Sequence, residues 1–89
     1  MKNILIFNDI SGLGNCSMSA NLPVFTKYGL YCIPVPTAVY SMQTGFDGFC
    51  VLPVEAGAFA KKALALRSAD AVYVGFCNDT ATLSAVGDL

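Results

Sequence analysis

The sequence predicts an α/β fold built on a parallel, Rossmann-like sheet. Two apolar runs, 3–7 and 71–74, have the continuous hydrophobicity of strands that are buried on both faces. Each run is followed by a polar segment and then by a region that can form a helix. Strands that are joined through a helix usually lie parallel with a right-handed crossover. We therefore expect the element order β-α-β-flap-α-β-α.

The first strand, 3–7, leads into a polar run with two glycines, 7–16, which we interpret as a loop that binds a ligand. A helix should follow, and Gly29 can cap its end. Its apolar face has four residues at helical spacing: Met18, Leu22, Phe25 and Tyr28. Because proline removes an amide donor, Pro23 should either bend this helix or start its regular part.

A second strand is expected over 30–39. Its two prolines, Pro34 and Pro36, favour an irregular or partly unpaired course, since proline cannot donate to a sheet ladder. The following segment, 40–52, mixes aromatic residues with glycines, and it could be a flap of short strands.

Pro53 is well placed to open a second helix, because proline suits the first helical turn. Three residues would form the apolar stripe of this helix: Phe59, Ala63 and Leu66. Its solvent side would be basic: Lys61, Lys62 and Arg67. The third strand is expected at 71–74, and Asn78 or Asp79 can cap a last helix beyond it.

The composition is unusual for a small independent domain. Hydrophobic residues make up 55% of the 89 residues and charged residues only 12%, about half of what soluble domains normally carry. A small domain has proportionally more surface to cover with polar groups. We therefore expect residues 1–89 to be one part of a larger, truncated domain, with much of its surface buried against the remainder.

Several classes of protein are disfavoured by the charges and the apolar runs. The five basic residues are scattered and the net charge is −1, so no patch suits a nucleic-acid backbone. No apolar run approaches the roughly 20 residues that span a bilayer. The N-terminus resembles neither a signal peptide nor an anchor, and we expect a cytoplasmic protein that binds neither nucleic acid nor membranes.

The cysteines do not predict a metal site. They are well separated, form no CxxC pair, and have no histidine to complement them: Cys16, Cys32, Cys50 and Cys77. Buried free thiols in a reducing compartment are the better interpretation. In the absence of histidine, a general base would have to be a carboxylate, a cysteine, a tyrosine or a lysine.

Polar residues follow each of the predicted strands. Because parallel strands bring their carboxyl ends to one edge of a sheet, Asp9 with Asn8, Thr37 with 41–44, and 76–79 should lie close together. They offer a carboxylate, hydroxyls, an amide and an aromatic face. This mixture is typical of a pocket that orients a small molecule.

Each candidate also has a purely structural interpretation. Asp9 and Ser11 could cap the first helix and order its turn. Thr44 could be a turn residue, and Phe76 could belong to the core. The glycine pair at 12–14 matches only part of a dinucleotide-binding fingerprint, and no phosphate loop of the GxxxxGK[ST] type is present, so the sequence assigns no cofactor-binding residue.

Several segments resemble, in order along the chain, the N-terminal part of pyridoxal/pyridoxamine kinases of the ribokinase-like (PfkB-type) superfamily. They are 8–17 (NDISGLGNCS), 22–23 (LP), Gly29, 36–39 (PTAV), 41–46 (SMQTGF) and 70–76 (DAVYVGF). The resemblance implies a partial ribokinase-like fold over residues 1–89. It also implies that the full-length protein transfers a phosphate from ATP, with Mg²⁺, to the 5′-hydroxymethyl group of pyridoxal, pyridoxamine or pyridoxine.

The resemblance also implies roles for particular residues. Asp9, Thr44 and Phe76 match positions that face the vitamer in these kinases, and Ser11 is a fourth candidate beside Asp9. The segment 40–52 matches a lid that contributes to a homodimer. Asp9 stands where many relatives have serine, and Met42-Gln43 stands where many have Asn-His or Thr-His. The identity of the vitamer stays open for this reason.

In the resembled family, the nucleotide site and a catalytic Gly-x-Gly-Asp loop lie in the C-terminal half, and residues 1–89 contain no such loop. We therefore expect no catalytic residue in this chain, no bound ATP or Mg²⁺, and no kinase activity of the 89 residues alone. Two alternatives remain open. One is a hydroxymethylpyrimidine or sugar kinase of the same superfamily, and the other is a noncatalytic module that binds a small ligand.

Overall fold

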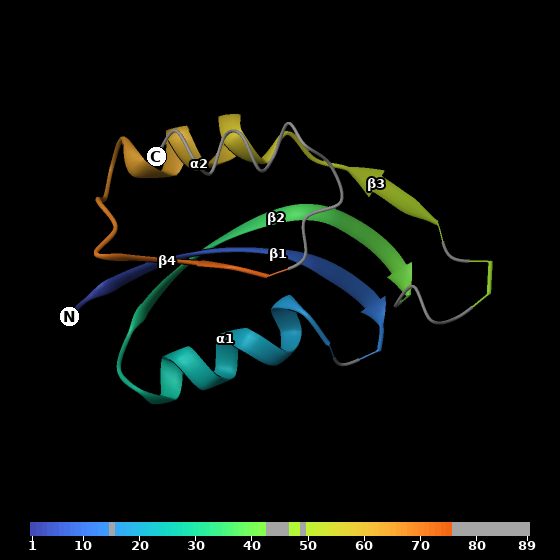
Figure 1. Cartoon of the computed structure of the whole chain (residues 1–89), viewed down its shortest axis with the longest axis horizontal. Coiled ribbons are helices and arrows are strands. Elements are labelled where there is room, and N and C mark those ends of the chain that lie inside the picture. Colours follow the sequence, from blue (N-terminus) through green and yellow to red (C-terminus); the bar gives the residue numbers. More distant parts are fainter. Residues whose placement is uncertain (15, 43–46, 49, 76–89) are drawn as a thin grey trace.

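A computed structural model describes residues 1–14, 16–42, 47–48 and 50–75, which form a sheet with a helix on each face (Figure 1). The elements in chain order are β1 (Asn3–Leu13), α1 (Met18–Lys27), β2 (Tyr31–Met42), β3 (Val51–Pro53), α2 (Ala56–Leu64) and β4 (Ala71–Val74). The α/β class and the predicted order are confirmed as far as β4. The predicted last helix, with its cap at Asn78 or Asp79, lies outside the described residues.

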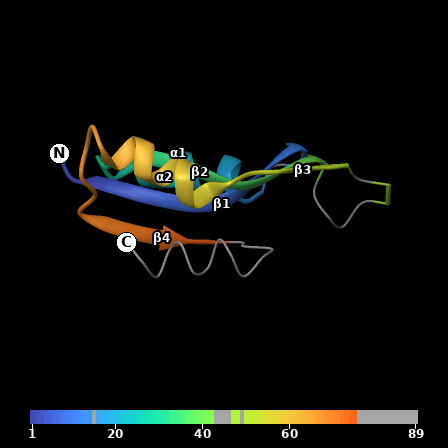
Figure 2. The same ribbon diagram turned by 90° about the horizontal axis from the view of Figure 1, so that it is seen from above.

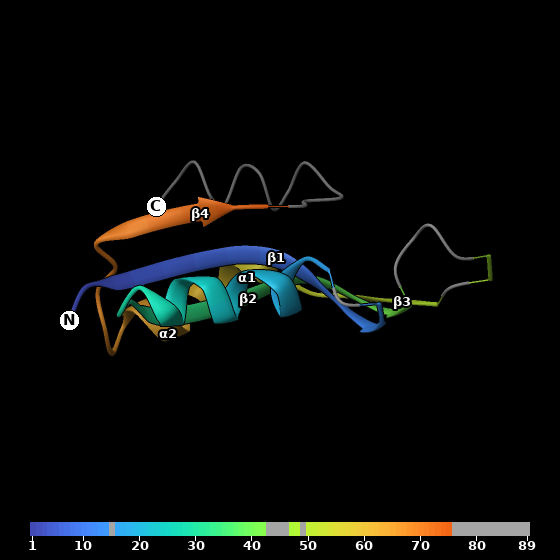
Figure 3. The same cartoon turned by 90° about the horizontal axis from the view of Figure 1, so that it is seen from below.

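The strand order within the described residues is β3-β2-β1-β4. β1 pairs in parallel with both β2 and β4, as predicted, whereas β3 pairs antiparallel with β2 through Ala38–Tyr40. Part of the predicted flap therefore forms a short antiparallel edge on an otherwise parallel sheet. Figures 2 and 3 show β4 as the outer described strand beside β1, and β3 extending away from the helices.

β1 is longer than predicted. The polar run expected to leave the sheet after Phe7 stays in the strand as far as Leu13, and the chain turns only at Gly14, whose φ is 106°. The interpretation of 7–16 as a single loop is therefore wrong for residues 7–13. The reason is pairing with β2, which continues to Leu13↔Met42. These ladder bonds outweigh the local turn preference of the sequence.

β2 runs further than predicted, to Met42, and accommodates both prolines. The N–H of Tyr31 donates to the carbonyl of Lys2 at 2.9 Å, so the even-numbered Pro34 and Pro36 turn their nitrogens away from β1. β3 does not reach these positions, and no ladder bond is lost there. The expected irregularity is present beside them, because β2 has one extra residue between the pairs Asn8↔Pro36 and Ile10↔Val39.

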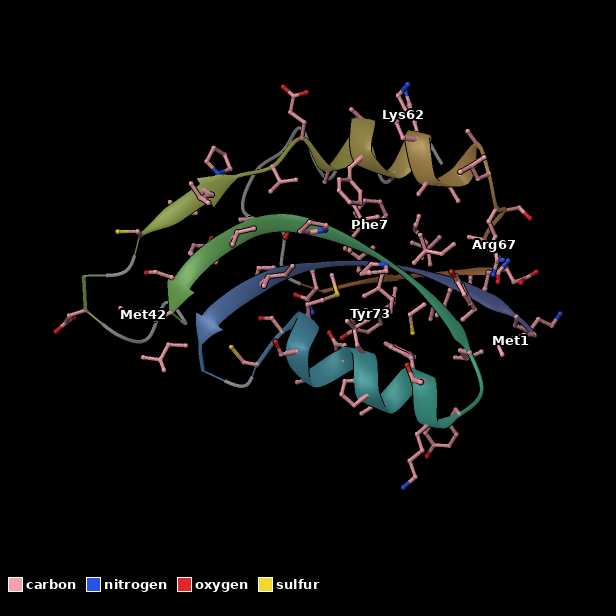
Figure 4. The ribbon with its side chains drawn as sticks, turned by 180° about the vertical axis from the view of Figure 1, so that it is seen from behind. Met1, Phe7, Met42, Lys62, Arg67 and Tyr73 are labelled. Atoms are coloured by element: carbon pink, nitrogen blue, oxygen red, sulfur yellow. The ribbon has the colours of Figure 1, made fainter. Side chains whose placement is uncertain are left out.

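The apolar half of β1 divides its side chains between two cores. Alternate residues of a strand point to opposite faces, and each face is covered by one helix. The core on the α2 side contains Leu5, Phe7, Ile33, Val35, Ala56 and Ala60. The core on the α1 side contains Ile4, Ile6 and Met18, with Leu22 and Phe25 packed against it. Figure 4 shows Phe7 between the sheet and α2 and Tyr73 on the side of α1.

α1 agrees with its predicted apolar face except at one residue. Met18 is buried, and Phe25 packs edge-on against Tyr73 of β4 with ring centroids 5.3 Å apart. Tyr28 follows the last helical residue and is exposed. Gly29 has φ 77° and donates its N–H to the carbonyl of Thr26, as expected of a helix C-cap. Pro23 lies inside the helix.

α2 differs from its prediction at both ends and in its buried face. It begins at Ala56, and Pro53 is the last residue of β3. Ala56 and Ala60 are buried, whereas Phe59 is 47% exposed and Leu66, beyond the helix, is 93% exposed. The predicted stripe is therefore wrong at these two residues. Alanines occupy the buried positions because their small side chains let the helix approach the sheet closely. Lys62 points away from the sheet (Figure 4).

Both helices are short, with 10 and 9 residues. Within the part of the chain that the structure describes, no helix has the length and apolar character needed to cross a membrane.

Because α2 packs closely on the sheet, enlarging a buried alanine and an exposed alanine of this helix should have different effects on stability. Ala60→Leu should lower the free energy of unfolding by about 1–3 kcal/mol, because the larger side chain must displace the core around Phe7. Ala58→Leu, on the exposed side of the same helix, should change it by less than about 0.5 kcal/mol. Chemical denaturation of both variants measures the difference, and equal effects would show that α2 is not packed as described.

Candidate functional site at the carboxyl end of the first strand

The carboxyl half of β1 buries polar side chains in place of apolar ones. Asn8, Asp9 and Ser11 are only 4%, 6% and 5% exposed. Aspartate is rarely buried to this degree without a partner, because removing a carboxylate from water is costly. The position is also notable: it is the carboxyl end of a central parallel strand, where open α/β sheets bind their ligands.

Asp9 is incompletely partnered. Ser11 donates its hydroxyl to Asp9 Oδ2 over a long distance of 3.5 Å. Asp9 Oδ1 is buried and has no hydrogen-bond partner among the described residues. Native proteins seldom leave a buried polar atom unpaired. One carboxylate oxygen is therefore available to a donor that the described residues do not provide.

Ser11 connects Asp9 to the segment that precedes α1. The thiol of Cys16 donates to Ser11 Oγ at 3.8 Å, so the hydroxyl accepts from one neighbour and donates to the other. Asp9 and Ser11 are two residues apart in a strand, the spacing that places side chains on the same side. The pair predicted from the sequence is thus brought together by the strand itself.

The structural alternative that Asp9 and Ser11 cap the first helix is wrong. α1 begins at Met18, its N-cap is Ser17, and no side chain makes a capping hydrogen bond there. Asp9 and Ser11 lie within β1, several residues before the helix, and cannot satisfy its free amides. Their burial needs an explanation other than helix capping.

Asn8 holds three elements together beside Asp9. Its Nδ2 donates to Asn21 Oδ1 in α1, and its Oδ1 accepts the backbone N–H of Asp9 at 2.9 Å. It also lies against Gly75, just after β4. A Cβ added to Gly75 would come within 2.5 Å of Asn8 Cγ, and Gly75 donates its N–H to the carbonyl of Phe7 at 2.7 Å. Asn8 therefore fixes the backbone from which the Asp9 side chain projects.

The second predicted strand also reaches this edge. Thr37 is buried and lies in the stretch of β2 opposite Asp9, between the register pairs Asn8↔Pro36 and Ile10↔Val39. Ser41 instead serves the flap, because its Oγ accepts the N–H of Cys50 at 2.8 Å. Thr44 and Phe76 lie outside the described residues, so their vitamer-facing roles stay predictions.

Asn21 and Gly75 were not recognised from the sequence as parts of this arrangement. A signal for Asn21 was available: it is a polar residue on the apolar face of α1, three residues after Met18 and one before Leu22. A polar side chain at such a position needs a buried partner, and Asn8 is that partner. The close approach of Gly75 to Asn8 depends on strand pairing and has no local signal.

A separate hollow of about 380 Å³ lies at the other end of the sheet, between the start of β2 and the end of α2. Its walls include Tyr31, Pro34, Ala63 and Leu66, and the guanidinium of Arg67 stacks 4.0 Å from the centre of the Tyr31 ring. This hollow is open and has no buried polar atom without a partner. The unpaired, buried Oδ1 of Asp9 therefore favours the carboxyl end of β1 as the candidate site.

The described residues do not assemble a metal site. No three histidine, cysteine or acidic side chains gather there in a way that could hold a metal ion, and the sequence has no Gly-x-Gly-Asp loop. We assign no step of phosphate transfer to this chain.

The described cysteines are free. Cys16 and Cys32 are half-buried and Cys50 is exposed, so the prediction of a buried thiol is wrong for Cys50.

Comparisons with known proteins agree with this architecture. No protein-family model matches the chain, and no curated protein matches it. Solved structures do. A protein of Bacteroides thetaiotaomicron, described as a phosphomethylpyrimidine kinase and crystallised with pyridoxal, matches 98% of this chain with a TM-score of 0.88 and 30% identity.

Two pyridoxal kinases match equally completely but with lower identity. The enzyme of Leishmania donovani, in complex with ADP and pyridoxamine, matches 99% of the chain with a TM-score of 0.83 and 14% identity. The enzyme of Staphylococcus aureus, in complex with AMP-PCP and pyridoxal, also matches 99%, with a TM-score of 0.78 and 22% identity. At such identities the likeness shows the fold alone. The chain spans about a third of the length of each of these three proteins: 32%, 34% and 34%.

The packing of Asn8 against Gly75 predicts a strong coupling between the two residues. Gly75→Ala should lower the free energy of unfolding by about 1–3 kcal/mol, because the new methyl group displaces the Asn8 side chain and its hydrogen bonds. In an Asn8→Ala background the same substitution should cost less than about 0.5 kcal/mol. A double-mutant cycle on unfolding free energies measures this coupling. Additive effects would mean that the two side chains do not share this space.

Proposed function

Because the chain has part of the fold of ribokinase-like kinases, we propose that it supplies the vitamer side of the pocket in an ATP-dependent kinase of vitamin B6. The enzyme transfers the phosphate to the 5′-hydroxymethyl group of a vitamer. The observation that carries the proposal is the buried pair Asp9 and Ser11 at the carboxyl end of β1, with Asp9 Oδ1 unpaired.

The chemistry of this pair suits a small, ring-shaped ligand with few polar groups. Ligand pockets are mostly apolar and use a small number of placed polar atoms to orient the ligand. Asp9 Oδ1 accepts a hydrogen bond, and the hydroxyl of Ser11 keeps the carboxylate in place. A ligand donor at this point completes the hydrogen bonding of a buried atom that otherwise lacks a partner.

The names of the solved relatives favour a B6 vitamer as this ligand. Pyridoxal is present in the Bacteroides structure with 30% identity, and the two pyridoxal kinases hold pyridoxamine and pyridoxal. In our proposal Thr44 and Phe76 face the same ligand. ATP and Mg²⁺ bind residues of the full-length protein other than those described, and they supply the phosphate and the neutralising charge.

A second candidate function has a specific observation in its favour. The Bacteroides relative is described as a phosphomethylpyrimidine kinase. A pyrimidine ring with an exocyclic amine and a hydroxymethyl group also presents an N–H donor and a phosphate acceptor. Substrate competition between pyridoxine and hydroxymethylpyrimidine in the full-length enzyme separates the two functions.

Removing either predicted polar contact should impair vitamer use selectively. In the full-length protein, Asp9→Ala or Thr44→Val should lower kcat/KM for the vitamer about ten- to a hundredfold, the equivalent of about 1–3 kcal/mol of lost hydrogen bonding. KM for ATP should stay within about twofold, since the nucleotide is bound elsewhere. Steady-state kinetics with each substrate varied in turn measures both parameters.

The matched control is Asp70→Asn, which changes a carboxylate at the opposite end of the sheet, where Asp70 accepts the N–H of Asn3. It should leave vitamer kinetics unchanged. Thermal midpoints should be recorded for all variants. A lowered midpoint with normal vitamer kinetics in both Asp9→Ala and Thr44→Val would show that these residues are structural and that the site assignment is wrong.

The 89-residue chain by itself should not phosphorylate any vitamer. Phosphoryl transfer depends on groups that position the nucleotide and stabilise developing charge, and we assign none of these to the described residues. Purified chain is incubated with ATP, Mg²⁺ and pyridoxal, and formation of pyridoxal phosphate is followed. Phosphate ester formation proportional to protein concentration would contradict the proposed division of labour.

A further inference from the structure

We propose that Asp9 makes the site selective for a ligand that presents a positively charged N–H group to Oδ1. The group is either a protonated ring nitrogen or an ammonium substituent. This inference rests on the proposed function and deepens it, because it states which form of a nitrogen heterocycle the site accepts.

The donors around Asp9 leave its Oδ1 without a partner among the described residues. The Ser11 hydroxyl contacts Oδ2, not Oδ1, and does so over 3.5 Å. The backbone N–H of Asp9 donates to Asn8 Oδ1 and so does not serve a carboxylate. Nothing else among the described residues donates to Oδ1. An ionised carboxylate only accepts hydrogen bonds, and the proposal assigns the donor to the ligand.

The positive charges of the chain lie far from Asp9 along the sheet. The chain has five basic residues in total, and each lies toward the amino end of the sheet. Lys2 precedes β1, Lys27 ends α1, and Arg67 stacks on Tyr31 at the start of β2. Lys61 and Lys62 occupy the last turn of α2. Figure 4 shows Lys62 and Arg67 far from Met42, which ends β2 at the carboxyl edge.

The unpaired Oδ1 and the distant basic residues together define the ligand. A buried negative charge is stabilised by a nearby opposite charge that also donates a hydrogen bond, and the described residues supply neither at Oδ1. A cationic N–H of the ligand supplies both. A serine hydroxyl in place of this carboxylate could donate or accept and would make no such demand.

The test compares ligands that differ in one atom. Binding of pyridoxine and of its analogue with C–H in place of the ring nitrogen is measured by calorimetry on the full-length protein. If the ring nitrogen is the partner of Oδ1, wild type should prefer pyridoxine by about tenfold or more, since the analogue leaves Oδ1 unpaired. Asp9→Asn and Asp9→Ser should reduce the preference to about threefold or less, because neither residue carries a charge that needs matching.

A second pair of ligands distinguishes the two sources of positive charge. Pyridoxamine has an amine that pyridoxine lacks. If Asp9→Asn weakens pyridoxamine about tenfold more than pyridoxine, the ammonium group is the partner of Oδ1. Equal weakening of both ligands identifies the ring nitrogen. Either result supports the inference, and Asp70→Asn should change neither affinity.

Two failures can be told apart. If wild type phosphorylates no B6 vitamer, the proposed function is wrong and the inference falls with it. If wild type phosphorylates a vitamer but both Asp9 variants keep the wild-type affinity ratios of pyridoxine to the carbon analogue and of pyridoxamine to pyridoxine, the inference alone is overturned. Using two variants guards against a folding defect in either one, and their thermal midpoints provide the check.

Discussion

The pairing of β1 on both of its sides is the constraint on which the rest of this structure depends. β2 and β4 each form a parallel ladder with β1, so its backbone is satisfied along the shared length and both of its faces lie under a helix. Its first half meets this environment with Leu5, Phe7 and the alternating isoleucines. Its second half remains in the ladder with β2 but carries polar side chains. This conflict between a buried strand and polar residues creates the candidate site.

Asn8 is a buried polar residue whose hydrogen-bond partners are supplied by the chain itself. Its Nδ2 donates to Asn21 in α1, its Oδ1 accepts the backbone N–H of Asp9, and Gly75 leaves the space that this side chain occupies. Asp9, one residue later, is resolved only in part, because Ser11 reaches one of its oxygens and the other has no donor in the described residues. Proteins tolerate such a local deficit mainly where function requires it. The contrast between these adjacent residues is the physical basis for placing ligand binding at Asp9.

The sequence was sufficient for the elements whose signal is local. The positions of β1 and β4, the spacing of Met18, Leu22 and Phe25, and the cap at Gly29 each depend on neighbouring residues, and each was predicted correctly. The expected burial of 71–74 on both faces is wrong, because all four residues of β4 are exposed at the end of the described strand order. The continuation of β1 to Leu13 was missed because it depends on pairing with β2, a long-range interaction that overrides the turn preference of Ser11-Gly12. In α2, the choice between the alanines and Phe59 depends on how closely the helix approaches the sheet. For the site, the convergence of Asp9 and Thr37 followed from the parallel topology. The contacts of Asn8 with Asn21 and Gly75 could not be predicted in this way, because they depend on how β1, α1 and the end of β4 pack together.

The most direct test of this account is a crystal structure of the full-length protein with a B6 vitamer bound. The account predicts a ligand nitrogen within about 3.2 Å of Asp9 Oδ1, at hydrogen-bonding distance, with the Ser11 hydroxyl still on Oδ2 and the ring over the carboxyl end of β1. A vitamer bound elsewhere, with Asp9 Oδ1 paired to a donor from the protein itself, would contradict it.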